Sequence, residues 1–238
     1  PDTLRSMNAL ANSYGRQERF EGAEKLHRQV LAERQRVLGP DHPDTLPTML
    51  GLASACADLG RLEEAESLAR QALEISQRTL GADHPVTLQA MVSLANAVTQ
   101  QGRHEEAELL YRKGLEISRR VNGPDHPDTL RWTNNLANDL LSQERYQEAE
   151  ALYGQVAEIG RRDLGPDHPT TLRALYNLAC SAALRGDRPA ALRYLREPVE
   201  GGWATRQKLE EDEDLASLRA DPEFQALVAR AKNPLAQP

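Results

Sequence analysis

Apolar residues recur along this chain in a pattern that repeats every 42 residues. A proline marks each repeat, at Pro1, Pro43, Pro85, Pro127 and Pro169. In every repeat a leucine stands three places after the proline, and a second leucine followed by an alanine stands nine places after it. The sixth place is methionine or leucine in all but the fourth repeat, so the apolar residues follow helical spacing. This pattern predicts an amphipathic helix in the first half of each repeat.

A second apolar run predicts a second helix in each repeat. It contains an alanine 22 places after the proline and, in the first four repeats, a leucine three places later. Gly-Arg or Glu-Arg pairs separate the two helices at residues 60–61, 102–103 and 144–145. Glycines stand where a left-handed cap can end the second helix, at Gly39, Gly81, Gly123 and Gly165. The small alanine on each helix allows two antiparallel helices to approach closely, and a bulkier residue there would overpack the contact.

The segment between repeats reads Asp-His-Pro-Asp-Thr-Leu at residues 125–130 and returns with small changes at 41–46, 83–88 and 167–172. Proline suits the first turn of a helix, where its missing N–H has no partner to lose. The residue before a proline is disfavoured in the α region, so the helix is expected to begin at the proline. Either the aspartate or the histidine could act as the N-cap, and the sequence leaves this choice open.

A fixed period of this length is typical of repeats that stack into a solenoid. The paired small alanines, the large residues Tyr111 and Tyr153 between them and the junction proline resemble the tetratricopeptide repeat (TPR). The 42-residue period, the long second helix, the junction at 164–169 and the segment 134–137 are similar to the repeats of kinesin light chains. The resemblance covers roughly residues 1–200, and nothing resembles the N-terminal coiled coil of that family. It implies an all-α, right-handed α-solenoid of five helix pairs, with units 1–42, 43–84, 85–126, 127–168 and 169–202.

The two ends of the repeat array depart from the pattern. In the fifth repeat Pro198 is expected to break the second helix, and Gly201-Gly202 to end the array. Beyond it, residues 203–238 are expected to form a C-terminal cap of short helices at 203–210, 215–219 and 221–231, with Asp221 as an N-cap and a frayed tail at 233–238. The apolar residues expected to cover the fifth repeat are Trp203, Leu215, Leu218, Phe224 and Leu227. At the other end Leu4, Met7 and Leu10 form an apolar edge that is expected to contact earlier repeats, a partner or a second copy.

Composition narrows the classes of function. The 238 residues carry a formal net charge of −7, which argues against binding to a nucleic acid backbone. Only 4% of the residues are aromatic, a composition that suits alanine- and leucine-rich helices better than a single globular core. Two cysteines do not form a disulfide framework, and no apolar run reaches the length that spans a membrane. We therefore expect a cytoplasmic, bacterial protein, of which this chain is one region.

The residues that could bind a metal or catalyse a reaction are better explained by structural roles within the repeat. His42, His84, His126 and His168 occupy the same corner of successive repeats, roughly 10 Å apart by helix packing, whereas metal ligands must converge on one ion. Paired glutamates fall in first turns of second helices, where they suit the helix dipole. Cys56 and Cys180 are expected to be buried side chains. We expect no catalytic site, cofactor or metal.

In a TPR stack the first helices line the concave surface, and positions 4, 7 and 11 after the repeat proline point into it. The resemblance to kinesin light chains implies that asparagines and basic residues on this face bind peptides. An asparagine amide can donate to and accept from one peptide group, and arginines favour acidic ligands. The residues expected to bind are Arg5, Asn8, Asn12, Gln89, Asn96, Arg131, Asn134, Asn138, Arg173 and Tyr176.

An alternative is that the asparagines bond to neighbouring helices and fix the repeat geometry. The favoured function is a protein- or peptide-binding scaffold. Two rival functions stay open from the sequence: a sensor region of a larger signalling or defence enzyme, such as an NTPase, kinase or protease, and a purely structural array that assembles through its N-terminal edge.

Overall fold

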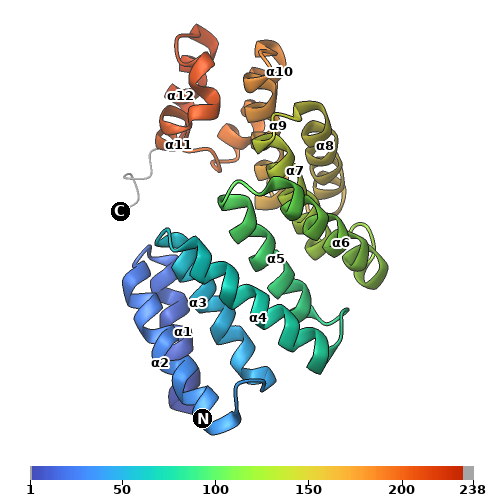
Figure 1. Ribbon diagram of the computed structural model, residues 1–238. Helices are drawn as coiled ribbons and strands as arrows, with labels where there is room; N and C mark the ends of the chain where they lie inside the picture. The colour runs from blue at the N-terminus through green and yellow to red at the C-terminus, as the bar shows by residue number, and fades with distance from the viewer. Residues whose placement is uncertain (1, 233–238) are drawn as a thin grey trace. The chain divides into compact units, whose positions relative to one another are not determined.

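The computed structural model describes residues 2–232 as a chain of helices (Figure 1). The expected fraying of residues 233–238 lies outside the described residues. The repeat helices are α1 Asp2–Arg16, α2 Phe20–Leu38, α3 Leu46–Asp58, α4 Leu62–Leu80, α5 Pro85–Gln100, α6 His104–Asn122, α7 Pro127–Ser142, α8 Tyr146–Asp163, α9 Pro169–Leu184 and α10 Arg188–Glu200. A 3₁₀ turn, η1 (Pro43–Thr45), precedes α3. The C-terminal elements are α11 Arg206–Glu211, the 3₁₀ helix η2 Glu213–Leu218 and α12 Pro222–Arg230.

The ten repeat helices form the five predicted pairs, and the chain divides into two compact units at the junction after the third pair. In the first unit, up to Pro124, each helix from α1 to α6 packs on the next, and the first helices α1, α3 and α5 also contact one another in order (Figure 1). In the second unit, from Asp125, α7 to α10 pack in the same sequence, η2 packs on α9, and α12 packs on α10 and α11. This arrangement confirms the predicted all-α repeat of helix pairs followed by a helical cap.

The junction histidine is the N-cap of the first helix in the third, fourth and fifth repeats, and of the 3₁₀ turn η1 in the second. The Nδ1 atom of each histidine accepts a hydrogen bond from the backbone N–H two residues later, at 3.1 to 3.2 Å. The four histidines are His42, His84, His126 and His168. An N-cap side chain satisfies one of the backbone donors that the first helical turn leaves free. The structure therefore settles the choice between aspartate and histidine, and it confirms the junction role of the histidines.

The junction glycines end the second helices in a backbone conformation that residues other than glycine rarely adopt. Gly39, Gly81 and Gly123 have φ of 92° to 95° and ψ of 157° to 163°. Positive φ was predicted, but these angles lie in the extended, essentially glycine-only region rather than the left-handed helical one. The junction threonine then donates from its hydroxyl to a glycine carbonyl, as Thr87 does to Gly81 at 2.7 Å. Glycine and threonine together hold the turn between repeats.

The two alanine columns lie in the helix contacts, as predicted. All ten alanines, one on each repeat helix, are buried: Ala11, Ala53, Ala95, Ala137, Ala179, Ala23, Ala65, Ala107, Ala149 and Ala191. Cys56 and Cys180 are buried as well. Burial raises the pKa of Cys56 to about 11, so this thiol stays protonated at neutral pH. At the N-terminal edge Leu10 is 45% exposed, and contact through this edge stays a prediction.

Two predictions about the C-terminal region were wrong. Pro198 does not break α10, which continues to Glu200. The proline lacks one main-chain N–H donor, and it stands in the last turn of α10. Its own carbonyl accepts from the N–H groups of Trp203 and Ala204 at 2.9 and 2.8 Å. Residues 203–205 are not helical, because α11 begins only after Thr205, whose side chain caps it. Asp221 does cap α12, through the N–H groups of Glu223 and Phe224.

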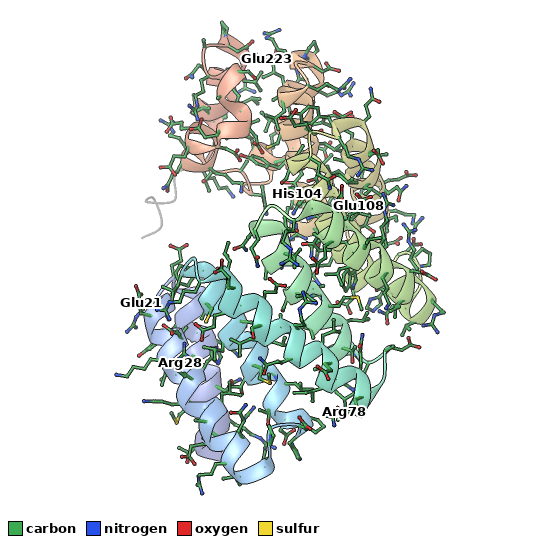
Figure 2. All side chains as sticks on the ribbon, in the orientation of Figure 1. Glu21, Arg28, Arg78, His104, Glu108 and Glu223 are labelled. Carbon is green, nitrogen blue, oxygen red and sulfur yellow. The ribbon has the colours of Figure 1, made fainter. Side chains whose placement is uncertain are left out.

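Exposed ion pairs link segments far apart in sequence. Near the ends of second helices, Arg78, Arg120 and Arg162 pair with junction aspartates 37 residues earlier in the chain, at 2.5 to 2.6 Å. Other pairs join neighbouring repeats, such as Arg28 to Glu64 at 3.0 Å (Arg28 and Arg78 are labelled in Figure 2). Each exposed pair contributes at most about 1 kcal/mol. Among the described residues, no helix combines the length and apolar character needed to cross a membrane.

Candidate functional site

Two of the three predicted columns lie at the surface of the first helices. At position 4, Arg5, Gln89 and Arg131 are exposed, while Arg173 is half-buried. At position 11, Asn12, Asn96 and Asn138 are all exposed. Seven residues correspond to nearly two full turns, so positions 4 and 11 share one stripe of the helix to within roughly 20°. We call this stripe, on α1, α3 and α5 in the first unit and on α7 and α9 in the second, the first-helix face.

The third column, at position 7, was wrongly placed on this surface. Asn134 and Tyr176 are only 3% and 2% exposed, and Asn8 is half-buried. Position 7 is rotated by roughly 40° to 60° from the stripe, which turns it toward the neighbouring helix. Asn8 on α1 accepts a hydrogen bond from the Thr48 hydroxyl on α3 at 3.1 Å. For this column the alternative interpretation holds, since its polar side chains bond to neighbouring elements.

Two buried tyrosines form hydrogen bonds with position 11 asparagines. The hydroxyl of Tyr153, on α8, donates to Oδ1 of Asn138 at 2.6 Å, and Tyr111, on α6, does the same to Asn96 at 2.6 Å. Both tyrosine side chains are buried, so the phenol fixes the amide oxygen on the protein side. Burial raises the pKa of the Tyr153 hydroxyl, which keeps it protonated as a donor. The amide NH₂ group of each asparagine is then directed away from the tyrosine.

In the second unit Asn177 joins the asparagines of the preceding first helix. Its Nδ2 donates to Oδ1 of Asn138 at 3.2 Å and to Oδ1 of Asn134 at 3.4 Å. Asn177 stands at position 8, which the sequence reasoning did not consider. Position 8 lies roughly 40° from position 4 on the side opposite to position 7, so a complete helical wheel would have included it. The three asparagines form one amide cluster between α7 and α9.

Two hollows interrupt the first-helix face of the first unit. The larger has a volume of about 350 Å³ and is lined by Asn12, Arg16, His27, Ser54 and Asp58 together with small residues of α1 to α3. The smaller, of about 150 Å³, is lined by Ser54, Asp58, Ser93, Asn96 and Gln100 together with alanines of α3 to α5. Each residue of the smaller hollow stands 42 places after one of the larger hollow. The two are therefore successive copies of one feature of the repeat.

Burial changes the ionisation of two side chains in the larger hollow. His27 is 2% exposed, and its burial lowers the pKa of the imidazole, which favours the neutral ring. Partial burial raises the pKa of the Asp58 carboxyl. Sequence reasoning missed both residues. Arg16 and Asp58 stand four residues after position 11 of their repeats. Residues four apart lie on the same face of a helix, so the sequence could have predicted that both line this surface. His27 belongs to a second helix, and nothing in the sequence indicated that it lies here.

The C-terminal cap covers Tyr176, one of the two predicted binding residues of the fifth repeat. The Tyr176 hydroxyl donates to Oδ2 of Asp212 at 2.7 Å. The Lys208 ammonium nitrogen lies 4.8 Å from the centre of the Tyr176 ring and 4.6 Å from that of Trp203, within cation–π range. Apolar residues of α9, α10 and the cap form one cluster, which includes Leu215, Leu218, Phe224 and Leu227 as predicted. The cap thus removes Tyr176 from the surface available to a ligand.

One cluster of possible metal ligands arises where the cap meets α9. Cys180, Asp212 and Asp214 offer three donor atoms within 4.8 Å of one another. Asp212 already uses both of its carboxylate oxygens, one for Tyr176 and one for the backbone N–H of Asp214 at 3.1 Å. Burial raises the pKa of Asp214, which disfavours the ionised form that a metal would require. We assign this cluster to the structure of the cap.

The sequence matches the tetratricopeptide repeat family over residues 2–77, 45–120, 100–159 and 128–199. The chain belongs to this family. It is similar to the crystal structure of nearly identical TPR-like repeats of a kinesin light chain-like protein from Podosopora anserina, at 30% sequence identity over 86% of this chain and 96% of that one, with a TM-score of 0.70. Among curated protein sequences, none matches this chain.

Two further crystal structures share the fold at lower identity. BtubC from P. vanneervenii is 20% identical over 88% of this chain and 82% of its own, with a TM-score of 0.69. A Rap protein complexed with Competence and Sporulation Factor is 16% identical over 90% of this chain and 56% of its own, with a TM-score of 0.71. At these identities the likeness concerns the fold alone.

Proposed function

We propose that this chain is a non-catalytic scaffold in which the first-helix face of each unit holds an extended peptide segment. The observation that carries the proposal is the pair of tyrosine-held asparagines, Asn96 and Asn138. Each is exposed, yet its amide oxygen is bonded to a buried phenol at 2.6 Å. An asparagine amide fixed in this way presents its NH₂ donors to the outside at no further cost in side-chain entropy. Such donors suit the carbonyl groups of an extended backbone.

Arginines on the same stripe give the ligand its expected charge. Arg5 and Arg131 are exposed at position 4, and Arg173 keeps a buried Nε atom that has no hydrogen-bond partner among the described residues. Arg131 is paired with Asp128 at 3.2 Å, an exposed contact that a carboxylate of a ligand can replace at small cost. The ligand proposed is therefore a peptide with acidic side chains. Each hydrogen bond adds only about 1 kcal/mol, so many contacts together give a micromolar complex.

The comparisons agree with this proposal at the level of the fold. TPR repeat families are generally non-catalytic scaffolds, and a Rap protein with the same fold was crystallised in complex with Competence and Sporulation Factor. For the present chain, the revised contact set is Arg5, Asn12, Gln89, Asn96, Arg131, Asn138 and Arg173. Asn8, Asn134 and Tyr176 are withdrawn from it because they are bonded or buried within the fold.

The test uses substitutions that spare the fold. Asn96→Asp and Asn138→Asp keep the oxygen that accepts from the tyrosine but remove the NH₂ donors. Peptides are first selected from an unstructured, acidic library on the wild-type chain, and their dissociation constants are then measured by calorimetry. We expect each substitution to weaken the selected peptides by about fivefold or more, the value of one lost hydrogen bond.

The control variant separates this effect from a general change in charge. Gln77→Glu adds the same negative charge to an exposed position on α4, a second helix of the first unit. It should leave the affinity within a factor of two. The proposal is wrong if the asparagine variants bind every selected peptide as tightly as the control does.

A further inference from the structure

An ion pair at one fixed position joins successive second helices in the first unit. Position 27 after the repeat proline is arginine in the first, second, third and fifth repeats. Arg28 bonds to Glu64, on the second helix of the next repeat, at 3.0 Å, and the second repeat forms the same pair with the third at 3.2 Å. In the fourth repeat this arginine is replaced by Gly154, and the glutamate that it would meet in the fifth repeat is replaced by Ala190. Helices α8 and α10 therefore lack both residues of this pair.

The same side of α8 is shortened again one turn later. Position 30 is a buried leucine in each of the first three repeats but Ala157 in the fourth. The two small residues line a hollow of about 370 Å³ between α8, α9 and α10, which we call the α8–α10 hollow (Figure 1). Its other apolar walls are the buried Leu175 and Leu178 of α9 and the half-buried ring of Tyr194 of α10. The fourth repeat thus has an open apolar space where earlier repeats carry an arginine and a leucine.

Packing within the chain does not explain the glycine. A methyl carbon added to Gly154 would meet no atom within 4 Å in the part of the chain that the structure describes. On the same helix, a methyl carbon added to Gly160 would fall 2.6 Å from the Thr171 hydroxyl oxygen, so a neighbour requires that glycine. A glycine inside a helix is less favourable than almost any other residue. The space beside Gly154 is therefore open to a group from outside the chain.

The third repeat departs from the pattern in the opposite way. Position 24 is polar or alanine in the other four repeats, but it is Leu109 in α6. The Leu109 side chain is 71% exposed, the largest fraction for any large apolar side chain in residues 2–232. Glu105 and Lys113 stand four residues before and after it, on the same face of the helix. Both are exposed, and neither forms an ion pair with a described residue. This face of α6 presents one leucine between two free charges of opposite sign.

The surroundings of the α8–α10 hollow carry the complementary charges. Glu158 lines the hollow, and the Arg193 guanidinium lies 4.8 Å from the centre of the Tyr194 ring that forms its wall. Both side chains are exposed, and neither has an ion-pair partner between residues 2 and 232. An apolar space with one free acid and one free base beside it matches a leucine with one free base and one free acid beside it.

We propose that the α8–α10 hollow receives Leu109 of a second copy of this chain. The leucine fills the apolar space that Gly154 and Ala157 leave, while Glu105 and Lys113 of the second copy face Arg193 and Glu158. Because the two contacting surfaces differ, the contact is heterologous, and each copy has one of each surface to offer. One leucine and two exposed ion pairs bury little area, so the contact is weak and reversible. It uses neither the N-terminal edge nor the first-helix face, and it does not rest on the proposed peptide binding.

The first test is sedimentation velocity over a wide range of concentration. The wild-type chain should associate reversibly as its concentration rises. Leu109→Gln removes the apolar side chain at an exposed position, and Gly154→Arg fills the hollow with the residue that other repeats carry. Arginine favours a helix more than glycine does, so this variant should be folded, which thermal melts check. Each change should weaken association by about tenfold or more, the value of one buried leucine.

Mixing the two variants distinguishes this contact from any symmetric one. Leu109→Gln keeps an open hollow, and Gly154→Arg keeps its exposed leucine, so a heterologous contact can form once between them. A fluorescently labelled sample of one variant should therefore form a 1:1 complex with the other, at concentrations where each variant alone stays monomeric. If the mixture forms no complex, the proposal is wrong.

Two control variants make the same chemical changes elsewhere. Leu184→Gln removes a leucine that is 40% exposed on α9, and Gln155→Arg adds an arginine on the exposed side of α8, outside the hollow. Both should associate within a factor of two of the wild type. Three results would overturn the proposal: a wild-type chain that stays monomeric at every concentration, Leu109→Gln or Gly154→Arg that associates like the wild type, or controls that weaken association as strongly as these variants do.

Discussion

The hydrogen bond between Tyr153 and Asn138 decides how the exposed asparagines of this chain should be interpreted. Tyr153 has no exposed surface, and its hydroxyl donates to Oδ1 of Asn138 at 2.6 Å. The substitution Tyr153→Phe removes only the hydroxyl and keeps the buried ring. If the bond orients Asn138, the change should lower the stability of the fold and also free the amide that faces a ligand.

The expected cost follows from the surroundings of each partner. A net hydrogen bond contributes about 1 kcal/mol, and leaving a buried acceptor unpaired would add a further penalty. Asn138 is exposed, so water can replace the phenol at its oxygen and the further penalty does not arise. We therefore expect Tyr153→Phe to lower the free energy of unfolding by about 1 kcal/mol, which corresponds to about 2–4 °C in melting temperature for a chain of this size.

A double-mutant cycle isolates the bond. Asn138→Ala also removes the bond that Asn177 donates, at 3.2 Å, but this second loss is present in both arms of the cycle and cancels. The coupling between Tyr153→Phe and Asn138→Ala, measured by urea denaturation, should be about 1 kcal/mol. Tyr194→Phe serves as the control, because the Tyr194 hydroxyl has no hydrogen bond within residues 2–232, and it should change stability by less than about 0.5 kcal/mol.

The reasoning is refuted if the coupling falls below about 0.3 kcal/mol, the level at which independent sites add. In that case the asparagine would be free to rotate, and its exposed amide would hold no fixed donors. A different result would be a large coupling energy combined with a peptide affinity that Tyr153→Phe does not change. The bond would then stabilise the repeat without preparing a binding group.

Three further predictions concern the junctions and the cap. His168→Ala should lower the free energy of unfolding by about 1 kcal/mol in thermal melts, because Nδ1 of His168 caps α9. His168→Asn should keep most of this stability, because asparagine can also cap a helix. Equal losses in the two variants would contradict the capping role. Glu144 has a φ of 59° in a turn where the second, third and fifth repeats carry glycine and the first carries Glu18, at a φ of 58°. Glu144→Gly should therefore raise the free energy of unfolding by about 0.5–1 kcal/mol, and Gly102→Ala, at a φ of 74°, should lower it. A lower free energy of unfolding in Glu144→Gly, or a higher one in Gly102→Ala, would show that the turn is unstrained. The ion pair with Arg188 lowers the pKa of Asp221 to about 2, below the unfolded value of about 3.9, so the stability it provides should be complete above about pH 4 and lost as the pH falls toward 2. Asp221→Asn can still cap α12, and it should weaken the dependence of the free energy of unfolding on pH between about 4 and 2. If NMR of the folded chain shows the Asp221 carboxyl titrating near pH 4, the lowered pKa is refuted.

The sequence by itself determined the repeat and most of its local structure. Apolar spacing specified two helices in each repeat, and the buried alanines mark where they touch, because both depend only on the chain's own helical period. The junction proline and glycines fixed where helices begin and end through their local backbone preferences. The histidine could be placed at the junction for the same reason. Its role as a cap needed atomic positions, since aspartate is equally able to cap.

Only the tertiary structure decided which of the polar residues reach the surface. A helical wheel gives the direction of a side chain about its own axis, but burial depends on the neighbouring helix. For this reason Asn134 is covered while Asn138, one turn later, stays exposed. Tyr176 matched the predicted column, yet the cap reached it from 36 residues away through Asp212. The hollow beside His27 likewise forms from three helices, and no single stretch of sequence records the space that they leave between them.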